Sequence, residues 1–363
     1  MWHKLYTDLK LQLIIEISTH CNAKCMQCSR TNIEGLGLHP QAPRPSHMSL
    51  ENFKKFFTPA DLRHLYNIHF SGTYGDPLMN PEIYEIIKYC CENMVDGWGT
   101  VSIATNGSIR DEDFWWELGI LCGKKLKVTF DIDGINQEMH EKYRRGTNLN
   151  KILRNMETLS LTKARIKTFT VLFKHNEDYI EEIKKICKDH GATEHEIIQS
   201  TRFFYGPVLN FINEKGEEET LEQAGSNSHQ DFVDFNRTTI RRLRDHRTLK
   251  SYSNLVKNFD NPPEISCAFF NSKSLHITVE GIVKPCCYWK AIPMEYSASN
   301  MQATGGANNV YKQFIGDISK YSLHNFSLSE ILNSKLYNND ILESFTDPDK
   351  LPRICLFQCR KKI

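Results

Sequence analysis

Short apolar runs alternate with segments of helical periodicity through the first two hundred residues of the chain. Six of the runs are short enough to be buried strands: 11–18, 65–70, 101–105, 126–132, 167–173 and 196–200. Segments that predict amphipathic helices lie between them: 50–57, 81–91, 112–122, 150–161 and 180–187. Ser49 is suited to cap the first of these helices, and Gly191 is suited to end the last. Strands that alternate with helices predict an α/β fold with a parallel sheet and right-handed crossovers.

The alternation stops after Pro207. Residues 210–263 are polar, with an acidic run followed by a basic run, and we predict a solvated connector with a charged helix. Contact of the basic run with nucleic acid or a peptide is the alternative, but no aromatic stacking platform accompanies the charges. From Ile265 onward a second region begins, with a hairpin predicted from 276–279 and 282–283.

Charge and composition exclude several classes of protein. Lysine plus arginine number 45 and aspartate plus glutamate 44, so no overall field attracts nucleic acid or an anionic membrane. No apolar run approaches the roughly 20 residues that span a bilayer, and the first residues do not resemble a secretory signal. We therefore expect a cytoplasmic protein with no membrane partner and no nucleic-acid partner.

Twelve cysteines are many for a chain of 363 residues, and seven of them form tight groups near the two ends. In a reducing compartment such grouping indicates metal or redox chemistry rather than disulfides. Four others lie in helical patterns and are expected to be core residues: Cys90, Cys91, Cys122 and Cys187.

The first group places Cys21, Cys25 and Cys28 within eight residues, directly after a predicted strand. Three thiolates so close together can face one iron–sulfur cluster. Three ligands on a 4Fe–4S cube leave one iron open to bind a substrate or cofactor, unlike a fully ligated cluster. Zinc is the alternative, although a structural zinc site needs a fourth ligand, for example His20.

This spacing and position resemble the radical SAM superfamily, whose signature is C-x3-C-x2-C after the first strand. The resemblance implies a partial (β/α)6 parallel barrel over residues 1–207 and a 4Fe–4S cluster that chelates S-adenosylmethionine (SAM). Reductive cleavage of SAM would release a 5′-deoxyadenosyl radical that abstracts hydrogen from a substrate. Gln27 departs from the family, in which an aromatic residue often precedes the third cysteine.

Later strand ends extend the resemblance to segments that bind SAM. The segment SGTYGDPL at 71–78 is similar to the family's glycine-rich loop, which contacts the methionine amino group. Asp131 occupies a place often held by a serine that binds the ribose, and Arg144 or Arg145 is expected to pair with the methionine carboxylate. The cofactor-binding residues that the resemblance implies are Gly72, Gly75, Asp76, Asn106, Asp131 and Arg144.

The second group resembles the C-terminal extension of the SPASM and twitch subfamilies, which begins with a cysteine, a hairpin glycine and a second cysteine. Residues 264–363 are therefore expected to be an auxiliary-cluster domain beyond the connector at 208–263. The number of cysteines in this region matches one auxiliary 4Fe–4S cluster, as in the twitch subfamily. The ligands expected are Cys267, Cys286, Cys355 and Cys359. Cys287 is the alternative to Cys286, and zinc is the alternative to the cluster.

An auxiliary cluster suits oxidation, because it can accept the second electron of a dehydrogenation. We therefore predict a radical SAM oxidoreductase that acts on a small molecule or a protein or peptide side chain and needs a reductant such as flavodoxin or ferredoxin. His69 and Asp133 are among the candidate bases. A maturase that forms crosslinks or epimers in a ribosomal peptide is one alternative. A non-catalytic iron–sulfur electron carrier or a zinc-stabilised binding protein is another.

Overall fold

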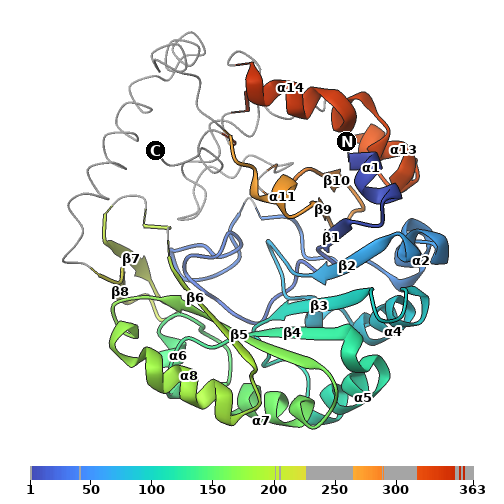
Figure 1. Ribbon diagram of the computed structural model, residues 1–363. Helices are drawn as coiled ribbons and strands as arrows, with labels where there is room; N and C mark the ends of the chain where they lie inside the picture. The colour runs from blue at the N-terminus through green and yellow to red at the C-terminus, as the bar shows by residue number, and fades with distance from the viewer. Residues whose placement is uncertain are drawn as a thin grey trace.

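Eight strands form one curved sheet in the computed structural model (Figure 1). The structure describes residues 2–40, 42–200, 202–203, 206–225, 265–287, 289, 317–347, 351–352 and 355. The strands of the large sheet are β1 Leu11–Ile15, β2 Leu65–Phe70, β3 Thr100–Thr105, β4 Leu126–Asp131, β5 Arg165–Leu172, β6 Glu194–Gln199, β9 Ser274–Ile277 and β10 Val283–Lys284. A second sheet pairs β7 Val208–Ile212 with β8 Glu218–Glu222.

Helices follow the strands along the chain. The α-helices are α1 Trp2–Thr7, α2 Leu50–Phe56, α3 Pro59–Arg63, α4 Ile83–Asn93, α5 Glu112–Cys122, α6 Gln137–Glu141, α7 Leu149–Ser160, α8 Ile180–Asp189, α11 Ala268–Asn271, α13 Leu328–Leu332 and α14 Ile341–Thr346. Short 3-10 turns are η1 Pro77–Met79, η2 Gly123–Lys125, η3 Glu177–Tyr179 and η5 Ile318–Tyr321, and η6 Leu336–Asp340 is a π-helix. Ser49 caps α2 by accepting the Asn52 N–H (3.1 Å), as predicted.

The strand order of the large sheet is β10-β9-β1-β2-β3-β4-β5-β6. Strands β1 to β6 are parallel and stand in sequence order, which confirms the predicted parallel α/β sheet and partial barrel. Among the described residues the sheet has two ends, at β10 and β6, and does not close. The predicted hairpin after Ile265 forms as β9 and β10, and β9 extends the sheet by pairing parallel to β1.

Bounds differ from the prediction most at the first strand, which ends at Ile15 rather than Ser18. Glu16 still donates its N–H to the Ile277 carbonyl of β9 (2.9 Å), but the next two residues hydrogen-bond away from the sheet. The Ile17 carbonyl accepts from the Met48 N–H (3.0 Å), and Ser18 pairs with His47 in an isolated bridge. The chain thus leaves β1 early and enters the long loop that carries the first cysteines.

The two faces of the sheet differ in polarity. The outer face of the sheet is covered by helices (Figure 1). Apolar side chains at alternate positions of β1, β3 and β4, such as Leu13, Val101 and Val128, are fully buried in the main core. Cys90, Cys91, Cys122 and Cys187 belong to this core, as predicted. The inner face carries polar, half-buried residues at the alternate positions. The packed core therefore lies between the sheet and the helices.

The segment after β6 differs in part from the expected solvated connector. Residues 208–222 form the β7–β8 hairpin, in which Phe211 and Leu221 are 4 % and 2 % exposed. These two side chains pack onto the cysteine loop, whereas most other residues of the two strands are exposed, as a solvated segment requires. The basic run and the expected charged helix lie outside the described residues. No helix in the part of the chain that is described has the length and apolar character to cross a membrane.

Candidate cofactor site at the carboxyl ends of the strands

The cysteines of the first group lie close together in the loop after β1. The Cys28 N–H donates to the Cys25 carbonyl (2.9 Å), which makes a tight turn. Burial raises the pKa of Cys25 to about 12; Arg144 opposes that rise, and the neighbouring Cys28 adds to it. Burial also raises the pKa of Cys21, and Asp76 and the other two thiols raise it further. Such thiols become thiolates beside strong positive charge, which the irons of a cluster supply.

The glycine-rich loop after β2 packs directly against the cysteine loop. A Cβ atom at Gly75 would lie 2.1 Å from the Ser18 carbonyl oxygen and 2.7 Å from that of His20. A Cβ at Gly72 would lie 2.0 Å from the Gly75 carbonyl oxygen. Only glycine allows these approaches, so Gly75 sets how closely the two loops meet, and Gly72 permits the turn within the glycine-rich loop.

Asp76 is buried between the ends of β2 and β3, and both of its carboxylate oxygens accept hydrogen bonds from the protein. They accept from the Thr105 hydroxyl (2.9 and 3.0 Å), the Asn106 N–H (2.8 Å) and the Leu78 N–H (3.0 Å). Burial raises the pKa of Asp76, and these hydrogen bonds oppose the rise. The carboxylate therefore fastens the glycine-rich loop to the end of β3.

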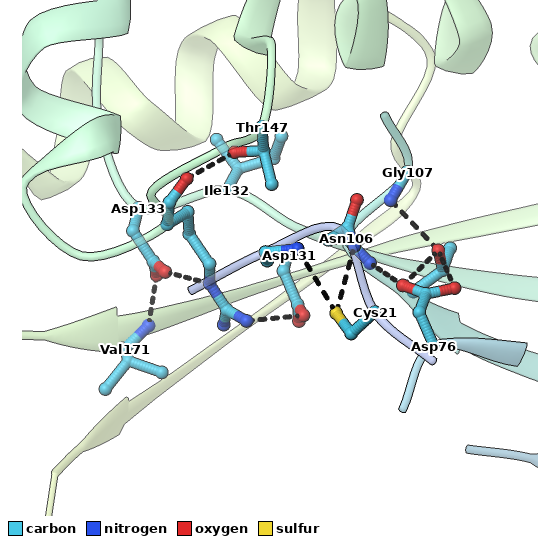
Figure 2. Close-up of polar contacts among 12 residues, drawn as sticks. Cys21, Asp76, Asn106, Gly107, Asp131, Ile132, Asp133, Thr147 and Val171 are labelled. Carbon is cyan, nitrogen blue, oxygen red and sulfur yellow. Dashed lines mark hydrogen bonds and ion pairs between the residues drawn. The ribbon is translucent and has the colours of Figure 1, made fainter. Parts of the chain in front are cut away.

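Asn106 joins the end of β3 to the cysteine loop. Its Nδ2 donates to the Asn22 side chain (2.8 Å) and lies 3.9 Å from the Cys21 sulfur. Figure 2 shows Asn106 between Cys21 and Asp76. The sequence places Asn106 at a strand end, and its contact with the cysteine is a feature of the folded chain.

Arg144 lies between two carboxylates, that of the last residue of β4 and that of the residue two positions beyond it. Its Nη1 is 2.8 Å from Asp131 and its Nε is 2.6 Å from Asp133. The Asp133 carboxylate is fully buried and also accepts the Val171 N–H (2.7 Å). Burial raises the pKa of Asp131 to about 7, against the effect of Arg144. The structure thus brings together two predicted site residues, Asp131 and Arg144.

The adjacent Arg145 points to different partners. Its guanidinium pairs with Glu219 and lies 3.5 Å from Glu214, both on the β7–β8 hairpin. Of the two arginines that the sequence left open, Arg144 therefore belongs to the group around Asp131, and Arg145 holds the hairpin.

His140 is a buried residue of this site that the sequence analysis missed. Its Nδ1 accepts the Asp133 N–H (3.1 Å), so its Nε2 carries the proton and donates to the Thr147 hydroxyl (3.0 Å). That hydroxyl donates to the Arg144 carbonyl (2.6 Å). The imidazole fixes the backbone on both sides of the Arg144–Asp133 pair, and nothing in the local sequence signals this role.

The inner face of the sheet carries a second polar group below the cysteine loop. The Ser102 hydroxyl donates to the side-chain amide oxygen of Asn67 (3.1 Å), so the hydroxyl oxygen accepts from His69 Nδ1 (2.9 Å). This assigns the ring proton to Nδ1 and leaves Nε2 unprotonated. Burial, together with Lys167, lowers the pKa of His69 to about 4, so the ring is neutral at pH 7. Asp133, the other base candidate, is fully engaged by Arg144 and Val171.

Glu16 lies just after β1, and the sequence analysis did not name it as a site residue. A carboxylate inside an apolar run is a sequence signal that could have identified it. The side chain is 2 % exposed and accepts the Tyr74 N–H of the glycine-rich loop (2.6 Å). Burial raises the pKa of Glu16 to about 7, while Lys284 on β10 opposes the rise. Lys284 is buried as well. Burial lowers the pKa of its ammonium group, and Glu16, Cys287 and Cys286 oppose that fall.

The second cysteine group is described in part. Burial raises the pKa of Cys355 to about 12, and Cys267 adds to it, so these two thiols lie near one another. Cys286 is buried and Cys287 is half-buried, and both follow β10. Cys359 lies outside the described residues. No three His, Cys, Asp or Glu side chains within the described ranges are arranged to hold a single metal ion.

Comparisons with known proteins agree with this arrangement. A family model of the radical SAM superfamily matches residues 15–187, and the model of an iron–sulfur cluster-binding domain, SPASM, matches residues 267–360. The first match contains the cysteine loop and strands β2 to β5, and the second contains the later cysteines. These two domains imply two 4Fe–4S clusters, one that binds SAM and one auxiliary. The gathered thiols of Cys21, Cys25 and Cys28 are suitable donors for the first.

Individual relatives have different activities. The chain is 25% identical over 305 residues to a GTP 3′,8-cyclase of Limosilactobacillus fermentum, covering 78% of this chain and 81% of the relative. It is 26% identical over 308 residues to a cysteine-type anaerobic sulfatase-maturating enzyme of Clostridium novyi, covering 76% and 73%. The solved structure of native anSMEcpe with bound AdoMet and Cp18Cys peptide has the same fold, with a TM-score of 0.51 and 16% identity over 93% of this chain and 83% of that one. The chain therefore belongs to the radical SAM superfamily and carries a C-terminal SPASM-type iron–sulfur domain.

Proposed function

We propose that this protein reductively cleaves SAM and dehydrogenates a substrate at a carbon next to a hydroxyl or thiol. The observation that carries the proposal is the meeting of three clustered thiols, of which Cys25 is buried, with the Asp131–Arg144–Asp133 group at the mouth of the partial barrel. Cys21, Cys25 and Cys28 would hold the SAM-binding cluster. Cys267, Cys286 or Cys287, Cys355 and Cys359 would hold the auxiliary one.

Two residues beside the cysteines suit the polar parts of SAM. Asp131 is one-fifth exposed and uses one carboxylate oxygen for Arg144, so the other is available for ribose hydroxyls. The Nη2 group of Arg144 is directed to neither carboxylate and suits the methionine carboxylate. Gly72, Gly75, Asp76 and Asn106 then act by shaping the loops around the cofactor.

Dehydrogenation must distribute a hydrogen atom, an electron and a proton. When bound, SAM and the two clusters supply the radical that removes the hydrogen atom and the acceptor that takes the electron. The proton needs a base in the protein. His69 suits this role better than Asp133, because its Nε2 is unprotonated and its ring is half-buried on the inner face.

The substrate is a small molecule or a side chain of a peptide or protein. The two relatives above are about equally similar to this chain, and their names point to GTP and to a sulfatase. Similarity therefore does not favour one class, and both belong in the test. A flavodoxin or ferredoxin is the expected electron donor.

The test uses the protein reconstituted anaerobically with iron and sulfide. Dithionite and SAM are added with carbon-deuterated probes, namely a cysteine peptide, a serine peptide and GTP. We expect 5′-deoxyadenosine to form and to carry deuterium from one probe, and the same probe used without deuterium should give a product 2 Da lighter than itself. Retained zinc without SAM cleavage contradicts the enzyme assignment, and a product of unchanged oxidation state contradicts the dehydrogenation.

A further inference from the structure

The β7–β8 hairpin lies against the loop that carries the first cysteines. Strand β7 meets the far end of that loop through backbone hydrogen bonds. The Ile212 N–H donates to the Ile33 carbonyl (2.8 Å), and the Gly35 N–H donates to the Ile212 carbonyl (2.9 Å). The hairpin and the cysteine loop are thus joined by an isolated parallel bridge between Glu34 and Ile212.

Apolar side chains of the hairpin cover the cysteines. Phe211 and Leu221 are almost fully buried in one cluster with Cys25, Met26 and Tyr143. This cluster is separate from the main core between the sheet and the helices. The hairpin therefore removes water from one side of the cysteine loop.

Charged side chains join the hairpin to the loop at a second point. Glu214 lies 3.4 Å from the ammonium of Lys24, which stands between Cys21 and Cys25 in the sequence. Glu219 pairs with Arg145, and the Asn213 side chain donates to Glu219 (2.7 Å).

The two basic partners are themselves connected. The Lys24 N–H donates to the Arg145 carbonyl (2.9 Å), and the Arg145 guanidinium lies over the Phe211 ring, 5.3 Å from its centre. Two carboxylates of the hairpin therefore hold two cations that flank the cysteines.

We propose that Glu214 and Glu219 are positioning residues for the SAM-binding cluster, acting through Lys24 and Arg145. This inference rests on the proposed function, because it requires a cluster on Cys21, Cys25 and Cys28. The hairpin keeps the loop in the shape that holds the cluster and balances the positive charge beside it. Reduction of a cluster adds negative charge, so an unbalanced cation nearby raises its reduction potential.

The test compares Glu219→Gln with Glu218→Gln in the anaerobically reconstituted enzyme. Glu218 is the neighbouring residue on β8 but is exposed, so its variant is a matched control. The first readout is the midpoint reduction potential of the cluster whose EPR signal changes when SAM is added. The second is the rate at which an iron chelator bleaches that cluster.

We expect Glu219→Gln to raise the midpoint potential and to speed bleaching about tenfold, equivalent to about 1.4 kcal/mol. Glu219→Asp should restore part of both, and Glu218→Gln should match wild type. Equal behaviour of Glu219→Gln and Glu218→Gln in both readouts overturns the proposal.

A second variant pair keeps the test decisive if Glu219→Gln fails to fold. Lys24→Met and Glu214→Gln remove the two sides of one ion pair, and their double variant should bleach no faster than either single variant. Additive effects of the two changes contradict the proposal. A wild-type protein without any SAM-responsive signal refutes the proposed function instead.

Discussion

The two cysteine-bearing regions of this chain are built in different ways. In the first, three thiols within eight residues lie among Asp76, Asn106 and the Asp131–Arg144 group, at the ends of several strands. In the second, Cys267 and Cys355 are brought together from positions far apart in the chain, beside the β9–β10 hairpin. A region that surrounds three thiols with polar groups suits a cluster that binds a cofactor, and thiols drawn together from distant positions would suit a fully ligated cluster.

The regions are nevertheless parts of one structure. Strand β9 hydrogen-bonds to β1, so the second cysteine region begins on the same sheet as the first. Glu16, just after β1, accepts a hydrogen bond from the glycine-rich loop. Lys284, two residues before Cys286, opposes the rise in the pKa of Glu16. The comparison predicts separate chemical tasks on a shared scaffold.

Cysteine substitutions should separate these tasks most strongly. We expect Cys21→Ala to lower SAM cleavage more than about 1,000-fold, because the SAM-binding cluster loses one of three ligands. Cys355→Ala should still cleave SAM without substrate while losing product formation, and its iron content should fall from about eight to about four per chain. Anaerobic measurement of iron, 5′-deoxyadenosine and product tests both. SAM cleavage by Cys21→Ala at the wild-type rate would contradict the ligand assignment.

The proton acceptor gives the next largest effect. His69→Gln should lower product formation about 100- to 10,000-fold, the usual range for a general base, whereas deuterium transfer to 5′-deoxyadenosine should persist. The measurement is the ratio of product to deuterated 5′-deoxyadenosine with whichever probe is accepted. Ser102→Ala removes the partner of His69 Nδ1 and should lower the ratio less. If His69→Gln leaves the ratio of product to deuterated 5′-deoxyadenosine unchanged, a group other than His69 accepts the substrate proton.

How far the sequence predicts this molecule depends on whether the signal is local. The six strands and the cysteine triad follow from short-range periodicity and spacing, and the strands stand where they were predicted within a few residues. Asp131 and Arg144 were each chosen as site residues, but their pairing with Asp133 arises only when the chain after β4 folds back.

The β7–β8 hairpin was missed because its residues look polar along the chain. Its alternating pattern places Glu218 and Glu222 outward and Leu221 inward, and the partners of Glu214 and Glu219 come from Lys24 and Arg145. A count of charges reads such a segment as solvated. Tertiary contacts with the cysteine loop, with β6 and with the chain after β5 make it structured.

Adjacent arginines should differ in their contribution to stability. Arg144→Met leaves the fully buried Asp133 carboxylate without its ion partner, which costs about 3–5 kcal/mol in comparable cases. Arg145→Met breaks pairs with carboxylates that are more than one-third exposed, and about 1 kcal/mol is expected. Urea unfolding of the two variants under anaerobic conditions measures the difference. Equal losses would mean that Asp133 finds another partner.

The link between the two regions should appear in the pH dependence of stability. Burial raises the pKa of Glu16 from 4.5 to about 7, so the folded protein binds this proton more tightly than the unfolded chain does. The resulting stabilisation is complete below pH 4.5 and is lost as the pH rises through 7, a change of about 3 kcal/mol. Glu16→Gln keeps an acceptor for the Tyr74 N–H and carries no charge. We therefore expect the variant to gain stability relative to wild type between pH 5.5 and pH 8, measured by urea unfolding.

Lys284 decides whether that titration connects the two regions. Its positive charge favours the Glu16 carboxylate, so Lys284→Met should move the fall in stability to higher pH and make it larger. Glu280→Gln is the matched control, because Glu280 is exposed and influences Glu16 less than Lys284 does. If Lys284→Met and Glu280→Gln give the same pH profile as wild type, the sheet joins the two cysteine regions mechanically and not through charge.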